Sequence, residues 1–175
     1  MVQSTMDGLN INWVGEKQMR KRIIESDIKE VAVAEYHGLN LQEIAQVEMT
    51  SEDEAHPIES AFVAGSDSCW LAASSGEQTL RLLFDAPQRL TMIRLLFQEE
   101  HQQRTQEFVL RWSSDGGISY HDIARQQYNF SSPDSTLQLE DYSVDLNGVT
   151  TLELCITPDI SGGTARASLA GWSVA

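Results

Sequence analysis

The most constraining feature of the sequence is an alternation of apolar and polar residues that ends in a pair of glycines. It lies in residues 108–120, which run FVLRWSSDGGISY, with Phe108, Leu110 and Trp112 on one face. A period of two predicts a half-buried strand, because successive side chains of a strand point to opposite faces. The Ser-Asp-Gly-Gly that follows predicts a tight hairpin turn, since Asp tolerates left-handed backbone and Gly supplies it. Residues 118–123 are then predicted to form the returning strand.

Further short strands are predicted along most of the chain after residue 40. They cover residues 41–50, 79–84, 90–97, 136–139, 142–146, 151–156 and 168–174. The turn between the second and third of these contains Pro87, which pre-sets the backbone. In residues 151–156 the apolar residues share one face, while Glu153 and Cys155 point away from it. Many short strands without helices between them predict an all-β sandwich or barrel and disfavour a parallel α/β sheet.

The first 40 residues are predicted to form an N-terminal extension, and residues 41–175 the main domain. Within the extension, residues 16–35 carry apolar side chains at the spacing of an amphipathic helix. The alternation of Val31 and Val33 leaves a strand open as an alternative for the last third. We expect this segment either to cover one end of the core or to form a contact surface for a second copy.

Composition limits the classes of partner. The 175 residues, 41% of them hydrophobic, suit one domain with a real core. The net charge of -14, from 12 basic and 26 acidic residues, argues against nucleic acid and against an anionic membrane surface as partners. No apolar run is long enough to span a bilayer. The N-terminal MVQSTMDGLN lacks a basic region followed by an apolar one, so we expect a cytoplasmic protein. The spacing of Cys69 and Cys155 fits neither a zinc site nor a redox pair, and we expect two reduced thiols.

Three stretches in order resemble the coagulation-factor C-domain, or discoidin, family. The first is HPIESAF at residues 56–62 with Trp70 after it, similar to the family's P-x-x-x-A-F-D-G-D-x-S-T-x-W segment. The second covers residues 80–96, similar to the family's paired strands, and the third covers residues 108–116 with Tyr120 after it. With the closing SLAGWSV, the resemblance extends over about residues 44–175. It implies an antiparallel jelly-roll β-sandwich of the galactose-binding-like class, in which Trp70 matches a family Trp of the core. We also expect Trp112, on the inward face with Phe108 and Leu110, and Trp172 to belong to the core.

The departures from the family pattern concern calcium. Val63 and Ala64 stand where the family has Asp-Gly, and Gly171 stands where it commonly has Glu in the last strand. Two oxygen ligands of the family's structural calcium ion are therefore missing, and Ca²⁺ is held by oxygen ligands. The resemblance implies a domain without calcium here, and we expect no cofactor.

The resemblance also implies that ligands bind to loops at one end of the sandwich, which places the candidates in residues 51–57, 65–69 and 98–106. Sugar-binding members use His and Arg to hydrogen-bond hydroxyl groups, together with an aromatic face, and both residue types offer directed donors. The predicted ligand-binding residues are His56, Glu99, Glu100, His101 and Arg104. The alternatives are a plain surface histidine beside Pro57 and a solvated loop tip whose internal ion pairs contribute little stability.

Motifs of the common enzyme classes are missing from the sequence. It contains no G-x-S-x-G elbow, no H-E-x-x-H and no glycine-rich phosphate loop. This absence predicts a non-enzymatic module, and the resemblance implies that it binds carbohydrate or another polyhydroxylated ligand. The alternative is a module for protein–protein interaction or homo-oligomerisation that acts as an accessory subunit, and a hydrolase is the weakest hypothesis.

Overall fold

The computed structural model describes residues 38–175. The chain divides into the units Met1–Glu35 and Tyr36–Ala175, and the fold described below is that of the second unit. The predicted helix at residues 16–35 lies outside the described residues, and the boundary at residue 40 stays a prediction. No helix within residues 38–175 has the length and apolar character that crossing a bilayer requires.

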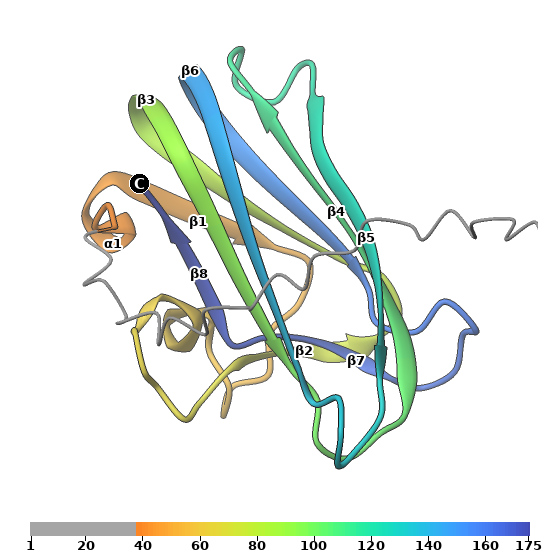
Figure 1. The fold of residues 1–175 in the computed structure, drawn as a ribbon. Coiled ribbons are helices and arrows are strands. Elements are labelled where there is room, and N and C mark those ends of the chain that lie inside the picture. Colours follow the sequence, from red (N-terminus) through yellow and green to blue (C-terminus); the bar gives the residue numbers. More distant parts are fainter. Residues whose placement is uncertain (1–37) are drawn as a thin grey trace, which may run out of the picture. The chain divides into compact units, whose positions relative to one another are not determined.

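The described unit consists mainly of antiparallel strands (Figure 1). In chain order its elements are α1 (Leu41–Ile44), β1 (Ala45–Met49), the 3-10 helix η1 (Ile58–Phe62), β2 (Trp70–Ser75), β3 (Gln78–Gln98), β4 (Arg104–Ser113), β5 (His121–Phe130), β6 (Leu137–Thr157), β7 (Arg166–Leu169) and β8 (Gly171–Val174). The main sheet has the order β1-β3-β6-β4-β5, with β8 on the other half of β3, and β2 pairs with β7 in a separate sheet.

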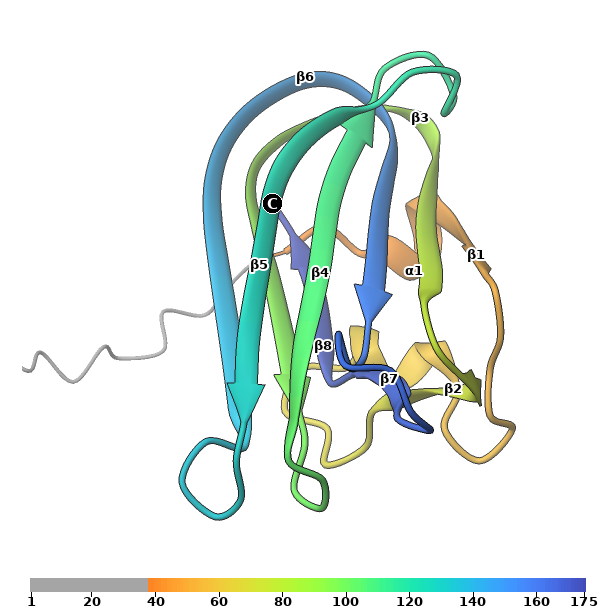
Figure 2. The same ribbon diagram turned by 90° about the vertical axis from the view of Figure 1, so that its right-hand side faces the viewer.

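Two long strands, β3 and β6, give the sandwich its two layers (Figure 2). Residues 80–84 of β3 pair with β1, and residues 151–157 of β6 pair with β4, so these halves belong to one layer. Residues 93–96 of β3 pair with β8 on one side and with the first half of β6 on the other, so these segments belong to the second layer. The ribbon shows both strands bending over at the same end of the domain. The predicted antiparallel β-sandwich is therefore confirmed.

The continuity of β3 and β6 corrects the predicted strand boundaries. Residues 79–84 and 90–97 are parts of one 21-residue strand, and the three strands predicted between residues 136 and 156 are parts of another. The register shifts between Leu83 and Met92 show that the segment around Pro87 is a bulge and not a turn. Proline lacks the N–H that a regular ladder needs, so the irregularity falls where the strand bends.

The core lies between the two layers and contains the aromatic residues that the sequence predicted. Phe97 from one layer stacks on Phe108 from the other, with 5.1 Å between ring centroids. Trp70 and Trp172 are 0% and 2% exposed, which confirms them as core residues. Trp112 is half-buried at the margin of the core.

The predicted hairpin exists, but its turn is longer than predicted. Strand β5 begins at His121, and Ile118, predicted to lie in it, is 87% exposed. The carboxylate of Asp115 accepts the backbone N–H groups of Ile118 and Ser119, at 3.1 and 2.9 Å. These local bonds replace the ladder over residues 114–120, as side-chain acceptors in turns commonly do.

The first and last predicted strands also need correction. Residues 41–44 form one helical turn that buries Leu41, and only residues 45–49 are a strand. The closing segment 168–174 divides at Ala170 into β7 and β8, which belong to different sheets. The N–H of Ala170 donates to the carbonyl of Leu96 at 2.8 Å, so the chain is anchored to β3 where it changes sheet.

Candidate ligand-binding pocket at the loop end

Loops from distant parts of the chain form a pocket at one end of the sandwich. In both ribbon views the β3–β4 connection and the segments on either side of η1 lie at this end (Figure 2). The cavity has a volume of about 300 Å³. Its lining residues, called here the loop-end pocket, are His56, Asp67, Cys69, Leu71, Gln98, Glu99, Glu100, His101, Arg166 and Ser168.

Strand pairing positions one wall of the loop-end pocket. In the small sheet, Leu71 of β2 lies opposite Ser168 of β7. The hydroxyl of Ser168 donates to the carbonyl of Gln98 at 3.2 Å, which ties β7 to the last residue of β3. The small sheet and the β3–β4 loop are therefore held together where the pocket lies.

Asp53 orients two of the lining side chains. Its Oδ2 accepts a hydrogen bond from Nη1 of Arg166 at 2.9 Å, and its Oδ1 lies 3.2 Å from Nδ1 of His56. The hydrogen bonds from Arg166, from His56 and from the N–H of Ala55 lower the pKa of Asp53 to about 2. Asp53 is therefore a carboxylate at neutral pH and accepts the proton on Nδ1 of His56. With Nδ1 directed at Asp53, Nε2 is the ring nitrogen that is left for a ligand.

Glu99 shapes the β3–β4 loop. Its Oε1 accepts the N–H groups of His101 and Gln102, at 2.9 and 3.1 Å, and its Oε2 accepts Nε of Arg104 at 2.9 Å. Burial raises the pKa of Glu99, but these hydrogen bonds outweigh burial and lower it overall. The carboxylate is thus ionised and already accepts hydrogen bonds from three donors. These bonds hold the backbone of the loop at His101 in a fixed conformation.

Arg104 lies beneath the loop. Only 4% of its surface is exposed, and Nη1 donates to the side chain of Gln106 and to the carbonyl of Pro158. Its guanidinium also lies over the ring of Phe130, at 4.9 Å from the centroid. Arg104 was predicted to contact ligand; it is bonded to Glu99 and is not among the residues that line the loop-end pocket, and its contact with a ligand stays a prediction.

The structure brings together four of the five predicted residues: His56, Glu99, Glu100 and His101 all line the loop-end pocket. Ligand contact by these residues stays a prediction. Arg166 was not predicted as a site residue, because the predicted closing strand began after it and Asp53 lies 113 positions away. One signal was present, since Arg166 is the only Lys or Arg after Arg125.

The chemistry of the pocket suits reversible binding. Burial raises the pKa of the Cys69 thiol, with a smaller contribution from Glu99, so the thiol stays protonated and is a weak nucleophile. The aromatic face that the family resemblance implied is missing from the described lining residues, and Leu71 supplies apolar surface instead. Within residues 38–175 no three His, Cys, Asp or Glu side chains are arranged to hold a metal ion. The remaining lining groups are hydrogen-bond donors and acceptors, and they include the positively charged Arg166 and negatively charged carboxylates.

Comparisons with known proteins show which fold this is. No family model matches the sequence, and no curated protein matches it. Among solved structures, the chain is similar to the family 32 carbohydrate-binding module of NanJ from C. perfringens, in complex with galactose. The TM-score is 0.58 at 12% identity, over 78% of this chain and 96% of that one.

Two further solved structures have the same fold. One is the family 32 module of AlyQ in complex with 4,5-unsaturated mannuronic acid, with a TM-score of 0.54 at 17% identity over 75% of this chain and 95% of that one. The other is a pectin-binding carbohydrate-binding module, with a TM-score of 0.54 at 20% identity over 75% and 89%. The chain therefore has the galactose-binding-like β-sandwich fold that its sequence predicted.

Proposed function

We propose that this protein is a non-enzymatic carbohydrate-binding module, and that its ligand binds in the loop-end pocket. The observation that carries the proposal is the arrangement around Asp53, which holds His56 and Arg166 in place on the pocket wall. The ligands in the similar structures, galactose and an unsaturated mannuronic acid, support carbohydrate as the ligand class. The ordered motifs over residues 44–175 support a distant relationship to the discoidin family within this fold.

The pocket has the hydrogen-bonding groups that a sugar needs. A sugar hydroxyl both donates and accepts, so it is best held by mixed partners. Arg166 uses Nη1 for Asp53 and for the carbonyl of Ala72, so the remaining guanidinium N–H groups are available to a ligand. Asp67 supplies an exposed carboxylate on the same wall. Because the carboxylates of Asp67, Glu99 and Glu100 all lie here, we propose a neutral sugar in preference to an anionic one.

Titration calorimetry against a panel of galactose, N-acetylgalactosamine, glucose and mannose tests this proposal. We expect at least one sugar to bind, and Arg166→Ala to weaken binding by about tenfold or more, because a hydrogen bond to a charged group contributes roughly 1.5–3 kcal/mol. His101→Ala should weaken binding as well. Arg89→Ala is the matched control, since Arg89 lies in an exposed pair with Asp145 outside the pocket.

Two results would contradict the proposal. The first is no measurable binding of any sugar of the panel at millimolar concentration. The second is binding that Arg166→Ala and His101→Ala leave unchanged, although both variants keep the wild-type unfolding transition.

The other expectations from the sequence stay predictions. These are the accessory role with a protein partner or a second copy, the cytoplasmic location, and a domain that works without calcium or another cofactor. Light scattering of the full chain would check the oligomeric expectation, and calorimetry with Ca²⁺ would check the metal expectation.

A further inference from the structure

A second depression lies on the sheet face that points away from the core, across β4, β5 and β6. It has a volume of about 290 Å³ and is called here the outer-face basin. Its lining includes five charged residues, Glu77, Glu107, Arg111, Asp122 and Arg125, together with Val109, Cys155 and Thr157. Val109 pairs with Cys155 on β6 and with Arg125 on β5. Because cross-strand partners project from the same face, Val109 and Cys155 form an apolar floor with charged side chains around it.

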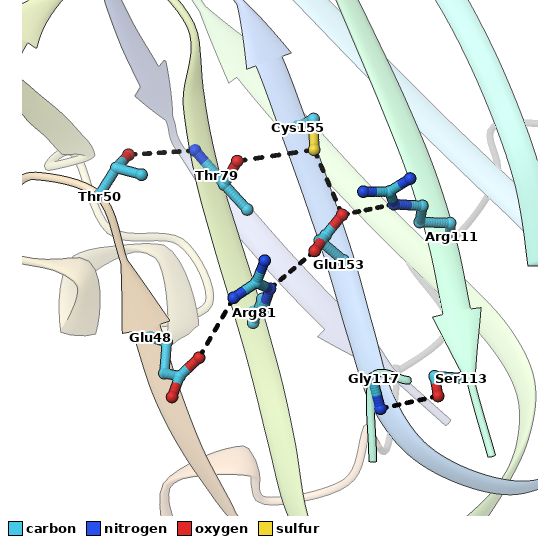
Figure 3. Close-up of polar contacts among 9 residues, drawn as sticks. All are labelled: Glu48, Thr50, Thr79, Arg81, Arg111, Ser113, Gly117, Glu153 and Cys155. Atoms are coloured by element: carbon cyan, nitrogen blue, oxygen red, sulfur yellow. Dashed lines mark hydrogen bonds and ion pairs between the residues drawn. The ribbon is translucent and has the colours of Figure 1, made fainter. Parts of the chain in front are cut away.

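Arg111 lines the basin, and Glu153 holds its side chain in place (Figure 3). The side chain of Glu153 is 0% exposed and lies between Arg81 and Arg111, accepting Nε of Arg81 at 2.7 Å and Nε of Arg111. The guanidinium of Arg111 also lies over the ring of Tyr120, at 4.6 Å from its centroid. Within residues 38–175, Arg111 donates to Glu153 through Nε alone. Its Nη1 and Nη2 are therefore fixed in position and still available to a ligand in the basin.

The basin has a second ordered set of polar groups. Nη1 of Arg125 donates to Oε1 of Glu107 at 2.8 Å, and Nε2 of Gln127 donates to Oε2 of Glu107 at 2.9 Å. Exposed pairs of this kind contribute little to stability. They do hold a guanidinium and a carboxylate side by side, and both groups face the basin.

We propose that the outer-face basin is a second binding site, separate from the loop-end pocket, for one ring of a neutral polyhydroxylated ligand. Planar guanidinium donors and carboxylate acceptors around a small apolar floor match a ring with hydroxyl groups at its edge and C–H groups on its face. Glu77, Glu107 and Asp122 outnumber Arg111 and Arg125, which disfavours an anion. A volume near the lower limit of ligand pockets admits one ring at a time. Preorganisation of Arg111 by Glu153 and Tyr120 lowers the entropy lost on binding.

The two cysteines allow the two sites to be tested separately, because Cys69 lines the loop-end pocket and Cys155 lines the outer-face basin. The experiment measures alkylation of each thiol by N-ethylmaleimide at mildly alkaline pH, with peptide mass spectrometry as readout. Galactose, N-acetylgalactosamine, glucose and mannose are the probes. We expect at least one sugar to slow the alkylation of Cys155 in a saturable way and to shift the backbone amide resonances of Val109 and Thr157.

Arg125→Ala identifies the cause of any protection. It should raise the sugar concentration needed to protect Cys155 by about tenfold, the loss expected for a charged hydrogen-bond donor, and leave Cys69 unaffected. Arg89→Ala, which removes an exposed pair elsewhere, should change neither thiol.

The outcomes separate this proposal from the function proposed above. Protection of Cys69 alone, with no shift at Val109, overturns the outer-face site and leaves the loop-end pocket standing. Protection of Cys155 alone supports the outer-face site and counts against the loop-end pocket. Protection of Cys155 that Arg125→Ala does not weaken also overturns the outer-face site, because the effect would then arise elsewhere.

Discussion

For Glu153, the sequence pattern predicts correctly which face of the strand the side chain lies on. The same pattern does not predict which side chains surround it there. The alternation in β6 placed Glu153 away from Leu152 and Leu154, and the structure agrees. An outward carboxylate is ordinarily solvated, yet this one is fully buried, because Arg81 and Arg111 lie on either side of it (Figure 3). Burial raises the pKa of Glu153, and the hydrogen bonds from Arg81 and Arg111 outweigh burial and lower it overall.

The first prediction is that Glu153→Gln destabilises the protein by about 2 kcal/mol, the cost of losing charge-assisted hydrogen bonds between buried groups. Urea unfolding followed by tryptophan fluorescence measures the change. Asp145→Asn is the control, because Asp145 pairs with Arg89 at an exposed position and should change stability by less than about 0.5 kcal/mol. Equal stability of Glu153→Gln and wild type would show that the buried cluster contributes nothing.

The second prediction concerns the pH dependence of that difference. The pKa of Glu153 in the folded state lies below its ordinary value of 4.5, so the ionised carboxylate stabilises the fold above that value. The contribution is lost as the pH falls through the lower folded-state pKa, where the carboxylate takes up a proton. The stability difference between wild type and Glu153→Gln should therefore be constant from pH 7 to about pH 5 and shrink below about pH 4. A difference that grows on acidification would contradict this sign.

At the scale of elements, the segment between β4 and β5 shows why a correctly predicted turn had the wrong length. Gly116 and Gly117 have the positive φ angles, 73° and 85°, that the Asp-Gly-Gly sequence predicted. The length is set instead by Asp115, whose carboxylate holds the backbone of Ser119, and by the position of Tyr120 over Arg111. Hydrogen bonds to Ser113, Ser119 and the backbone keep the pKa of Asp115 well below its usual range.

The third prediction compares Gly117→Ala with Gly116→Ala. Both variants force alanine into left-handed backbone, which costs about 1–2 kcal/mol. A Cβ on Gly117 would also lie 2.8 Å from the hydroxyl of Tyr120, whereas a Cβ on Gly116 meets nothing within 4 Å. We expect Gly117→Ala to be the less stable variant in urea unfolding, and to displace Tyr120 from Arg111. Equal destabilisation by both variants would mean that Tyr120 moves aside without cost.

At the scale of the whole molecule, charge determines which partners are disfavoured. The chain carries a net charge of -14, and its Arg side chains in the described sheets are largely paired with carboxylates, as in Arg94–Asp141 and Arg125–Glu107. A phosphate backbone or an anionic bilayer needs a continuous basic surface to release counterions.

The fourth prediction is therefore that the full chain does not retard duplex DNA in a gel-shift assay at about 0.15 M salt, and does not sediment with phosphatidylserine vesicles. The charge of both surfaces has the same sign as that of the protein, so the long-range electrostatic force is repulsive. Retention that disappears as salt is raised would contradict this reasoning.

Features that depend on neighbours along the chain could be predicted from local patterns of residues. The period of two gave the strands, their buried faces and the aromatic core, because side-chain alternation is a local property of extended backbone. Turn residues located the loops that carry His56, Glu99, Glu100 and His101, and the family resemblance implied that these loops lie at one end of the domain.

Features that depend on contacts between residues far apart in the chain could not be predicted in this way. Pairing with β6 on both sides of the bulge made β3 one bent strand where local residues indicated a turn, and the fold paired the buried Arg104 with Glu99. It also joined Arg166 to Asp53, and enclosed Glu153 between arginines from β3 and β4. The physical reason is that burial and ion pairing depend on strand register and on which strands become neighbours, and no local pattern contains either.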